Sequence, residues 1–271
     1  MQTQFLERPD GKIAYDDQGH GPLVICAPSM GDVRGEYRFL APQITAAGFR
    51  AVSVDVRGHG ESSTGWPDYS VGAVGSDLLA MIDRLDAGPA VIVGTSMAAG
   101  AGVWAAAEAP QRVSGLVLID PFVRSEANKA LSLLMSLMFA RPWGPATWLM
   151  YFASLYPTRK PPDFTAYRTA LRKNLAEPGR LEALQRMLAA SKAAAEERLP
   201  RVKAPVLVLM GSKDPDFKDP ATEAQWIAQR LHGQIEMVKD AGHYPHAEMP
   251  DQVGEIILAF IRKVTNVSDL H

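Results

Sequence analysis

A serine in this chain stands where an apolar, β-branched run meets a stretch of small residues. The run 90–93 ends at Gly94, Ser96 follows two residues later, and an alanine-rich stretch comes next. This order predicts a strand, a sharp turn and a helix, with Ser96 at the tip of the turn. The helix N-terminus offers free N–H groups and partial positive charge, which favour negative charge nearby. Ser96 is therefore a candidate nucleophile rather than an ordinary turn residue.

A serine nucleophile needs two partners, and the sequence offers candidates for both. The hydroxyl is a weak nucleophile near neutral pH until an adjacent base takes its proton. His243, directly after Gly242 near the C-terminus, suits that role because the histidine pKa lies near working pH. Asp214, after the apolar run 206–210, can orient the imidazole. Each group follows a predicted strand, so all three can converge on one edge of a sheet.

Both partners have rivals in the sequence. Among six histidines, His246 is the strongest competitor of His243, and otherwise we expect it at a pocket wall or at the surface. Asp216 and Asp120 compete with Asp214 for the role of the acid. In the plainer interpretation, Asp216 caps a turn and Asp120 begins a loop.

The composition bounds the class of protein. With 271 residues, 47% hydrophobic and 21% charged, the chain can bury a substantial core. The net charge is −2, and the lysines and arginines form no evident basic stripe, which argues against nucleic acid as a partner. We find no signal peptide and no apolar run of the roughly 18 residues that would span a membrane. The single Cys26 excludes an internal disulfide. We expect a cytoplasmic monomer or homodimer.

Short apolar runs alternate with helical patterns along most of the chain. This alternation predicts an α/β fold with a mostly parallel, doubly wound sheet. We expect a hairpin over 3–17, strands at 23–27, 51–54, 90–93, 114–119, 206–210 and 234–238, and helices at 36–47, 73–86, 97–108, 221–231 and 250–264. Residues 121–200 have no strand-like run and read as a helical insertion. The expected division is a core of 1–120 and 201–271 with a cap of 121–200.

Several motifs in this order resemble those of the α/β-hydrolase family over nearly the whole chain. They are the turn Gly94-Thr95-Ser96-Met97-Ala98, the segment Asp55-Val56-Arg57-Gly58-His59-Gly60-Glu61-Ser62, the pair Gly211 and Asp214, and Gly242-His243. Ala98 stands where the family usually has a second glycine, a mild departure of one methyl group. The resemblance implies a catalytic triad of Ser96, His243 and Asp214 beneath a helical cap.

The resemblance also implies where an oxyanion would be held. One N–H donor is that of Met97, after the nucleophile, and by position the second is that of Met30. Here Pro28-Ser29 replaces the family's usual His-Gly. Ser29 is either an ordinary loop residue or an extra donor whose hydroxyl lies near the oxyanion. The nearby Asp32 and Arg34 are expected at the surface, unless a polar substrate contacts them.

The predicted cap is rich in methionine and aromatic residues, and most of them would form its own core. A minority would face the pocket, and the candidates for substrate binding are Ser29, Phe122, Met138, Trp143 and Trp148. An apolar roof of this kind favours an ester with a hydrophobic acyl or alcohol part.

The expected function is a serine hydrolase that cleaves a small carboxylic ester through an acyl-enzyme, with no metal or organic cofactor. Alternatives within the same fold are a cofactor-free perhydrolase or haloperoxidase, a lactonase, an amidase and a carbon–carbon bond hydrolase, which fold and triad do not distinguish. An alternative of another class is a ligand-binding sensor with only weak hydrolysis.

Overall fold

The structure, a computed structural model, describes residues 2–124, 138–140 and 142–266, and it is built around one eight-stranded sheet. The strands are β1 (Gln4–Arg8), β2 (Gly11–Gln18), β3 (Leu23–Ala27), β4 (Arg50–Val54), β5 (Ala90–Thr95), β6 (Val113–Ile119), β7 (Val206–Gly211) and β8 (Gln234–Val238). Their order is β1-β2-β4-β3-β5-β6-β7-β8, antiparallel from β1 to β4 through β2 and parallel beyond.

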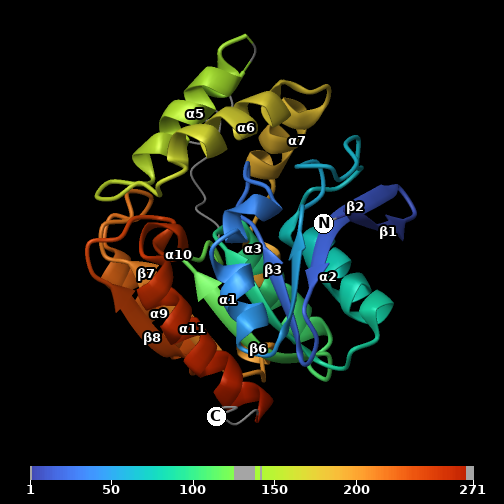
Figure 1. Cartoon of the computed structure of the whole chain (residues 1–271), viewed down its shortest axis with the longest axis vertical. Coiled ribbons are helices and arrows are strands. Elements are labelled where there is room, and N and C mark those ends of the chain that lie inside the picture. The colour runs from blue at the N-terminus through green and yellow to red at the C-terminus, as the bar shows by residue number, and fades with distance from the viewer. Residues whose placement is uncertain (1, 125–137, 141, 267–271) are drawn as a thin grey trace.

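Helices connect the parallel strands and cover both faces of the sheet (Figure 1). They are α1 (Leu40–Ala46), α2 (Val71–Leu85), α3 (Met97–Glu108), α5 (Gly144–Ser154), α6 (Phe164–Ala176), α7 (Arg180–Ala189), α8 (Ala193–Glu196), α9 (Pro220–Leu231), α10 (Pro245–Glu248) and α11 (Pro250–Thr265), with the 3₁₀ turns η1 (Arg34–Tyr37) and η2 (Leu199–Arg201). Within the described residues, no helix is long and apolar enough to cross a membrane.

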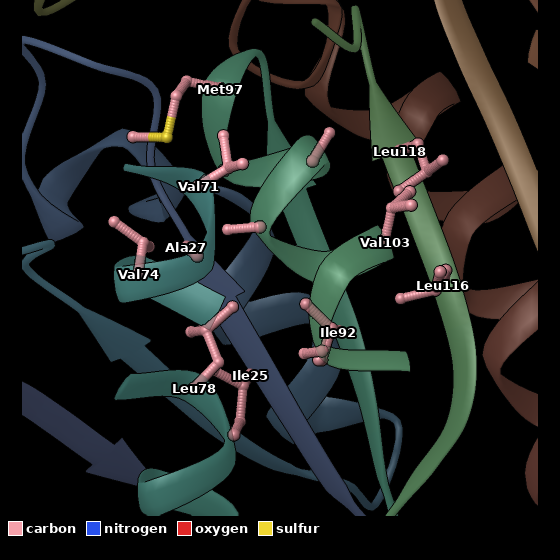
Figure 2. Packing of buried hydrophobic residues seen from close by; sticks show 14 of the residues in the cluster. Ile25, Ala27, Val71, Val74, Leu78, Ile92, Met97, Val103, Leu116 and Leu118 are labelled. Atoms are coloured by element: carbon pink, nitrogen blue, oxygen red, sulfur yellow. The ribbon is translucent and has the colours of Figure 1, made fainter. Parts of the chain in front are cut away.

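Alternate residues of the central strands point to opposite faces, and each face has its own apolar core. On one face, strand residues such as Ile25 and Ile92 pack with Val74 of α2 and Val103 of α3 (Figure 2). The other face joins the intervening strand residues to α1 and α11. Burial on both faces explains why the parallel strands read as continuous apolar runs.

The predicted hairpin and the predicted strands are confirmed, but the predicted helix at 36–47 is divided. The structure has η1 over Arg34–Tyr37 and then α1 over Leu40–Ala46. Pro42 lacks the N–H that would bond the carbonyl oxygen of Arg38, so one of the helical hydrogen bonds that would join the two segments is missing.

The segment between β6 and β7 contains α5 to α8, in the place where the sequence predicts a helical insertion. In Figure 1, α5, α6 and α7 lie together at one end of the molecule, away from the sheet. The boundary of the predicted cap at 121–200 stays a prediction, and residues 125–137 and 141 lie outside the described part of the chain.

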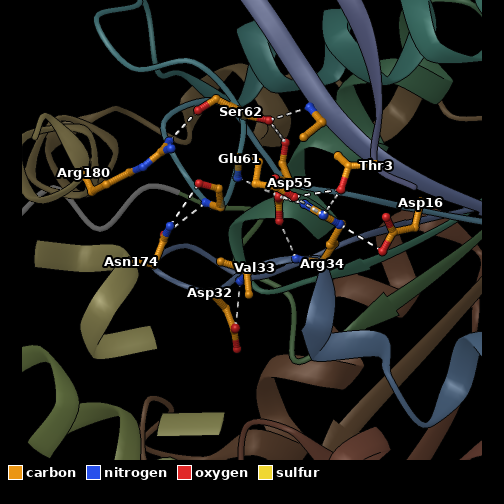
Figure 3. A network of polar contacts seen from close by, with 12 residues as sticks. Thr3, Asp16, Asp32, Val33, Arg34, Asp55, Glu61, Ser62, Asn174 and Arg180 are labelled. Carbon is orange, nitrogen blue, oxygen red and sulfur yellow. Dashed lines mark hydrogen bonds and ion pairs between the residues drawn. The ribbon is translucent and has the colours of Figure 1, made fainter. Parts of the chain in front are cut away.

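The turn after β4 connects the predicted cap to the core (Figure 3). Asn174 of α6 forms paired hydrogen bonds with the backbone of Gly60, at 3.0 and 3.1 Å, and Arg180 of α7 donates to the carbonyl oxygen of Ser62. Gly60 has a φ of 54°, and an added Cβ would lie 2.0 Å from the carboxylate of Asp55. This turn is therefore a structural element that anchors α6 and α7.

Candidate active site

Ser96 occupies a strained turn between β5 and α3. Its φ of 57° and ψ of −119° lie in a region that non-glycine residues rarely adopt, and its side chain is nearly buried. The chain can turn this sharply because Gly94 has no side chain. A Cβ there would lie 2.7 Å from the carbonyl oxygen of Ala98. The structure thus has the strand, sharp turn and helix that the sequence predicts, with Ser96 at the tip of the turn.

His243 and Asp214 form a buried pair. The distance from His243 Nδ1 to Asp214 Oδ2 is 2.6 Å, and both side chains are almost completely buried. Burial alone would lower the pKa of His243, but the adjacent Asp214 carboxylate more than offsets this and raises that pKa above its ordinary value of 6.5. Asp216 Oδ2 lies farther away, 3.8 Å from Nδ1. The nearest acid to the histidine is thus the one that the sequence favours.

Phe122 contacts both Ser96 and His243. Its backbone N–H donates to the carbonyl oxygen of Ser96 at 3.1 Å, and its ring centroid lies 5.9 Å from that of His243. The ring also stacks on Phe217 at 4.9 Å. Ser96, Phe122 and His243 therefore meet at one edge of the sheet, although they come from different parts of the sequence.

Asp120, a rival for the role of the acid, lies in the same cluster. Asp120 follows β6, Asp214 follows β7 and His243 follows β8, so neighbouring strands deliver all three to one edge. One ligand atom from each of the three lies within 4.8 Å of the others. Two ligands of a tetrahedral ion at about 2.0 Å would be about 3.3 Å apart, farther than the 2.6 Å between His243 and Asp214. That distance fits a hydrogen bond rather than a shared metal.

The loop after β3 carries the predicted oxyanion donor and is fixed by Ser29. The hydroxyl of Ser29 lies 2.6 Å from the hydroxyl of Tyr244, and its backbone N–H donates to Glu36 Oε2 at 2.8 Å. Met30 follows and packs, half-buried, against the apolar cluster that contains Met97. Ser29 is thus a buried, bonded loop residue.

A second buried pair, which the sequence does not predict, lies beside this loop. His246 Nε2 lies 3.1 Å from Glu36 Oε1, and both side chains are about 1% exposed. The ring of His246 also stacks on Tyr37 at 5.2 Å. The expectation that His246 lies at a pocket wall or at the surface is wrong, because this residue of α10 is buried against η1.

Asp32 and Arg34, expected at the surface, are also held by partners. Asp32 is fully buried and accepts a hydrogen bond from the hydroxyl of Tyr167. Burial and the neighbouring Glu36 raise the pKa of Asp32 well above its usual value. Arg34 forms ion pairs with Asp16, Asp55 and Glu61 (Figure 3). Both residues therefore have structural contacts.

Trp148 of α5 packs against the loop after β3. Its ring lies so close to Gly31 that a Cβ at Gly31 would be 2.1 Å from it, and its Nε1 donates to the Gly31 carbonyl oxygen at 3.3 Å. At the C-terminal end of α5, the carbonyl oxygen of Leu155 accepts a hydrogen bond from the backbone N–H of His243 at 3.0 Å. The helix thereby contacts both loops that carry predicted catalytic groups.

The predicted substrate-binding residues have different environments. Ser29 and Trp148 are buried, and Phe122 lies beside His243. Met138 and Trp143 are 37% and 55% exposed. A substrate role for any of these five residues stays a prediction.

Comparisons with known proteins agree with the fold. A family model described as the alpha/beta hydrolase family matches residues 24–256. The putative non-heme bromoperoxidase BpoC of Mycobacterium tuberculosis is 29% identical, and the match covers 93% of this chain and 98% of that protein. The 3-oxoadipate enol-lactonase 2 of Acinetobacter baylyi is 24% identical over 78% of each chain.

Solved structures resemble the whole chain. The esterase EaEST from Exiguobacterium antarcticum superimposes with a TM-score of 0.84 at 17% identity, covering 96% of this chain and 100% of that one. The enol-lactonase from Burkholderia xenovorans LB400 gives 0.81 at 20% identity, over 95% and 99% of the two chains. At these identities the similarity concerns the fold alone.

Proposed function

Because this chain belongs to the alpha/beta hydrolase family, we propose that it is a serine hydrolase that cleaves carboxylic esters. Ser96 attacks the ester carbonyl carbon while His243 takes the hydroxyl proton, and Asp214 orients the imidazole and stabilises its charged form. The N–H groups of Met30 and Met97 hold the oxyanion. His243 then protonates the leaving alcohol, and a water molecule activated by the same histidine releases the acid.

The observation that carries this proposal is the His243–Asp214 hydrogen bond of 2.6 Å beside the strained Ser96 turn. A buried imidazole oriented by a carboxylate is what a serine nucleophile needs as its base. Phe122 links the two sides, since it bonds the backbone of Ser96 and its ring neighbours His243.

Purified protein would be tested with short-chain aryl esters and with a fluorophosphonate probe. We expect steady turnover and labelling at Ser96, with both lost in Ser96→Ala. Ser191→Ala, at an exposed serine, is the matched control and should keep both. Turnover that persists in Ser96→Ala at the wild-type rate would refute the proposal.

Lactones and peracid formation belong in the same panel, because relatives of this chain carry the names enol-lactonase and bromoperoxidase. A lactone passes through the same acyl-enzyme but keeps its leaving group attached, so its kcat/KM relative to the open ester identifies the preferred class. A burst of one equivalent without further turnover would favour the ligand-binding sensor instead.

A further inference from the structure

Asp120 is a buried carboxyl group that the proposed mechanism does not use. It follows β6, between the strands that carry Ser96 and Asp214, and its exposed fraction is 0%. Its φ is 41°, in the left-handed region that favours glycine, asparagine and aspartate. A residue with this uncommon backbone conformation requires contacts that hold it there.

Two hydrogen bonds attach Asp120 to β7. Its backbone N–H donates to the carbonyl oxygen of Leu209 at 2.9 Å, and its Oδ1 accepts the N–H of Gly211, also at 2.9 Å. Asp214 follows three residues after Gly211. The other oxygen of Asp120, Oδ2, is buried and accepts no hydrogen bond from any described donor.

The neighbours of this carboxyl group are the two buried partners of the candidate active site. Atoms of Asp120, Asp214 and His243 lie within 4.8 Å of one another, and Asp216 Oδ2 lies 3.8 Å from His243 Nδ1, the same nitrogen that faces Asp214. Two buried carboxylates at this separation cannot both be ionised at low cost. The charge belongs on Asp214, because that carboxylate bonds His243 at 2.6 Å. The proton therefore resides on Asp120.

The electrostatics agree with this assignment. Burial, followed by the charge of Asp214, raises the pKa of Asp120 well above its usual value. Burial would also raise the pKa of Asp214, but the adjacent His243, and after it the neighbouring Asp120 carboxyl group, hold it below its usual value.

We propose that Asp120 is a positioning residue: a neutral carboxylic acid whose O–H donates to the Asp214 carboxylate and keeps that carboxylate directed at His243. The proposal rests on the proposed function, in which His243 is the base. Asp120 then acts through Asp214, without touching substrate. It is the fourth group in the series Ser96, His243, Asp214 and Asp120, which follow the adjacent strands β5, β8, β7 and β6.

Asp120→Asn and Asp120→Ala separate this role from a merely structural one. The amide of asparagine can accept from Gly211 and donate to Asp214, as the neutral acid does, so kcat should stay within about three-fold of wild type. Alanine removes the donor to a charged group, and we expect kcat to fall about 10- to 100-fold with little change in KM. Asp86 has a similar backbone, with a φ of 45°, at the exposed end of α2. Asp86→Asn and Asp86→Ala are therefore the matched controls and should keep wild-type kcat.

The pH profile tests the charge of Asp120. If Asp120 is neutral, the acid limb of kcat/KM occurs at the same pH in wild type and Asp120→Asn. If Asp120 is ionised, asparagine removes a negative charge beside His243 and moves the limb to lower pH, which would overturn the proposal. Wild-type kcat in a folded Asp120→Ala would overturn it as well.

A readout without turnover keeps this test separate from that of the proposed function. An infrared difference spectrum between wild type and Asp120→Asn should contain the carbonyl band of a protonated carboxyl group. Its absence contradicts the proposal even if Ser96→Ala is inactive, and its presence supports the proposal even if the substrate class is wrong.

Discussion

The hydroxyl groups of Ser29 and Tyr244 lie 2.6 Å apart and are buried, although 215 residues separate them in sequence. Ser29 belongs to the loop after β3, which carries the proposed oxyanion donor, and Tyr244 follows the proposed base, His243. The contact therefore connects the two sides of the candidate site, so that a displacement of one loop is opposed by the other.

Ser29→Ala should leave kcat within a few-fold of wild type, because the hydroxyl already bonds Tyr244. We expect it to lower the free energy of unfolding by about 1 kcal/mol, the usual contribution of one hydrogen bond. Urea denaturation and ester turnover measure the two effects. Tyr244→Phe and the double variant complete the cycle and should show coupling in stability. A loss of kcat near the 10²–10³-fold typical of an oxyanion donor, in Ser29→Ala alone, would instead make Ser29 such a donor.

The activity should rise with pH through an apparent pKa above 6.5. Only neutral His243 can accept the proton of Ser96, so activity is lost below the pKa of His243, and Asp214 raises that pKa. The kcat/KM for a neutral ester, measured from pH 5 to 10, gives the acid limb of the pH profile and its apparent pKa. Asp214→Asn should move it to lower pH and reduce kcat about 10⁴-fold. A wild-type limb below 6.5 would contradict the assignment of this pair.

Glu36→Ala should destabilise the protein by about 1–3 kcal/mol, because it leaves the buried N–H of Ser29 without its acceptor. Urea denaturation at pH 7 measures this loss. Glu36→Gln keeps an acceptor for Ser29 and should cost less. Glu61 pairs with Arg34 at a side chain that is 55% exposed, so Glu61→Ala should cost at most about 1 kcal/mol. Equal losses at the two glutamates would show that the Glu36 pair contributes no more than a surface pair.

The predictable parts of the fold are those that local sequence determines. Burial on both faces makes the central strands continuously apolar, so 23–27, 90–93 and 206–210 are identifiable from hydrophobicity alone. The Ser96 turn was identifiable because its glycine, serine and small residues are contiguous.

The unpredictable parts are contacts between distant residues. Nothing near His246 indicates that Glu36, 210 residues earlier, lies beside it. Asp120 and Asp214 compete as candidate acids in the sequence, yet the pairing of β6 with β7 places both in one cluster. Strand order and side-chain direction decide such contacts, and neither follows from residue spacing.

Gly94→Ala tests whether the sharpness of the Ser96 turn matters for catalysis. The new Cβ would lie 2.7 Å from the carbonyl oxygen of Ala98, in backbone that cannot rotate away, so the turn must shift. We expect a loss of about 1–3 kcal/mol in the free energy of unfolding. A nucleophile displaced by as little as 1 Å can cost about 10²-fold in rate, so kcat should fall by a similar factor.

Gly102→Ala is the matched control, since it adds the same methyl group in the second turn of α3 instead of at Gly94 of β5. Its Cβ would lie 3.3 Å from Ile92 Cγ2, a side-chain atom that can move by a few tenths of an ångström, and alanine favours the helix over glycine by about 1 kcal/mol. Stability should therefore change little and kcat should not change. If both variants lose activity equally, the effect comes from packing around α3 in general. If only Gly94→Ala does, it comes from the turn that holds Ser96.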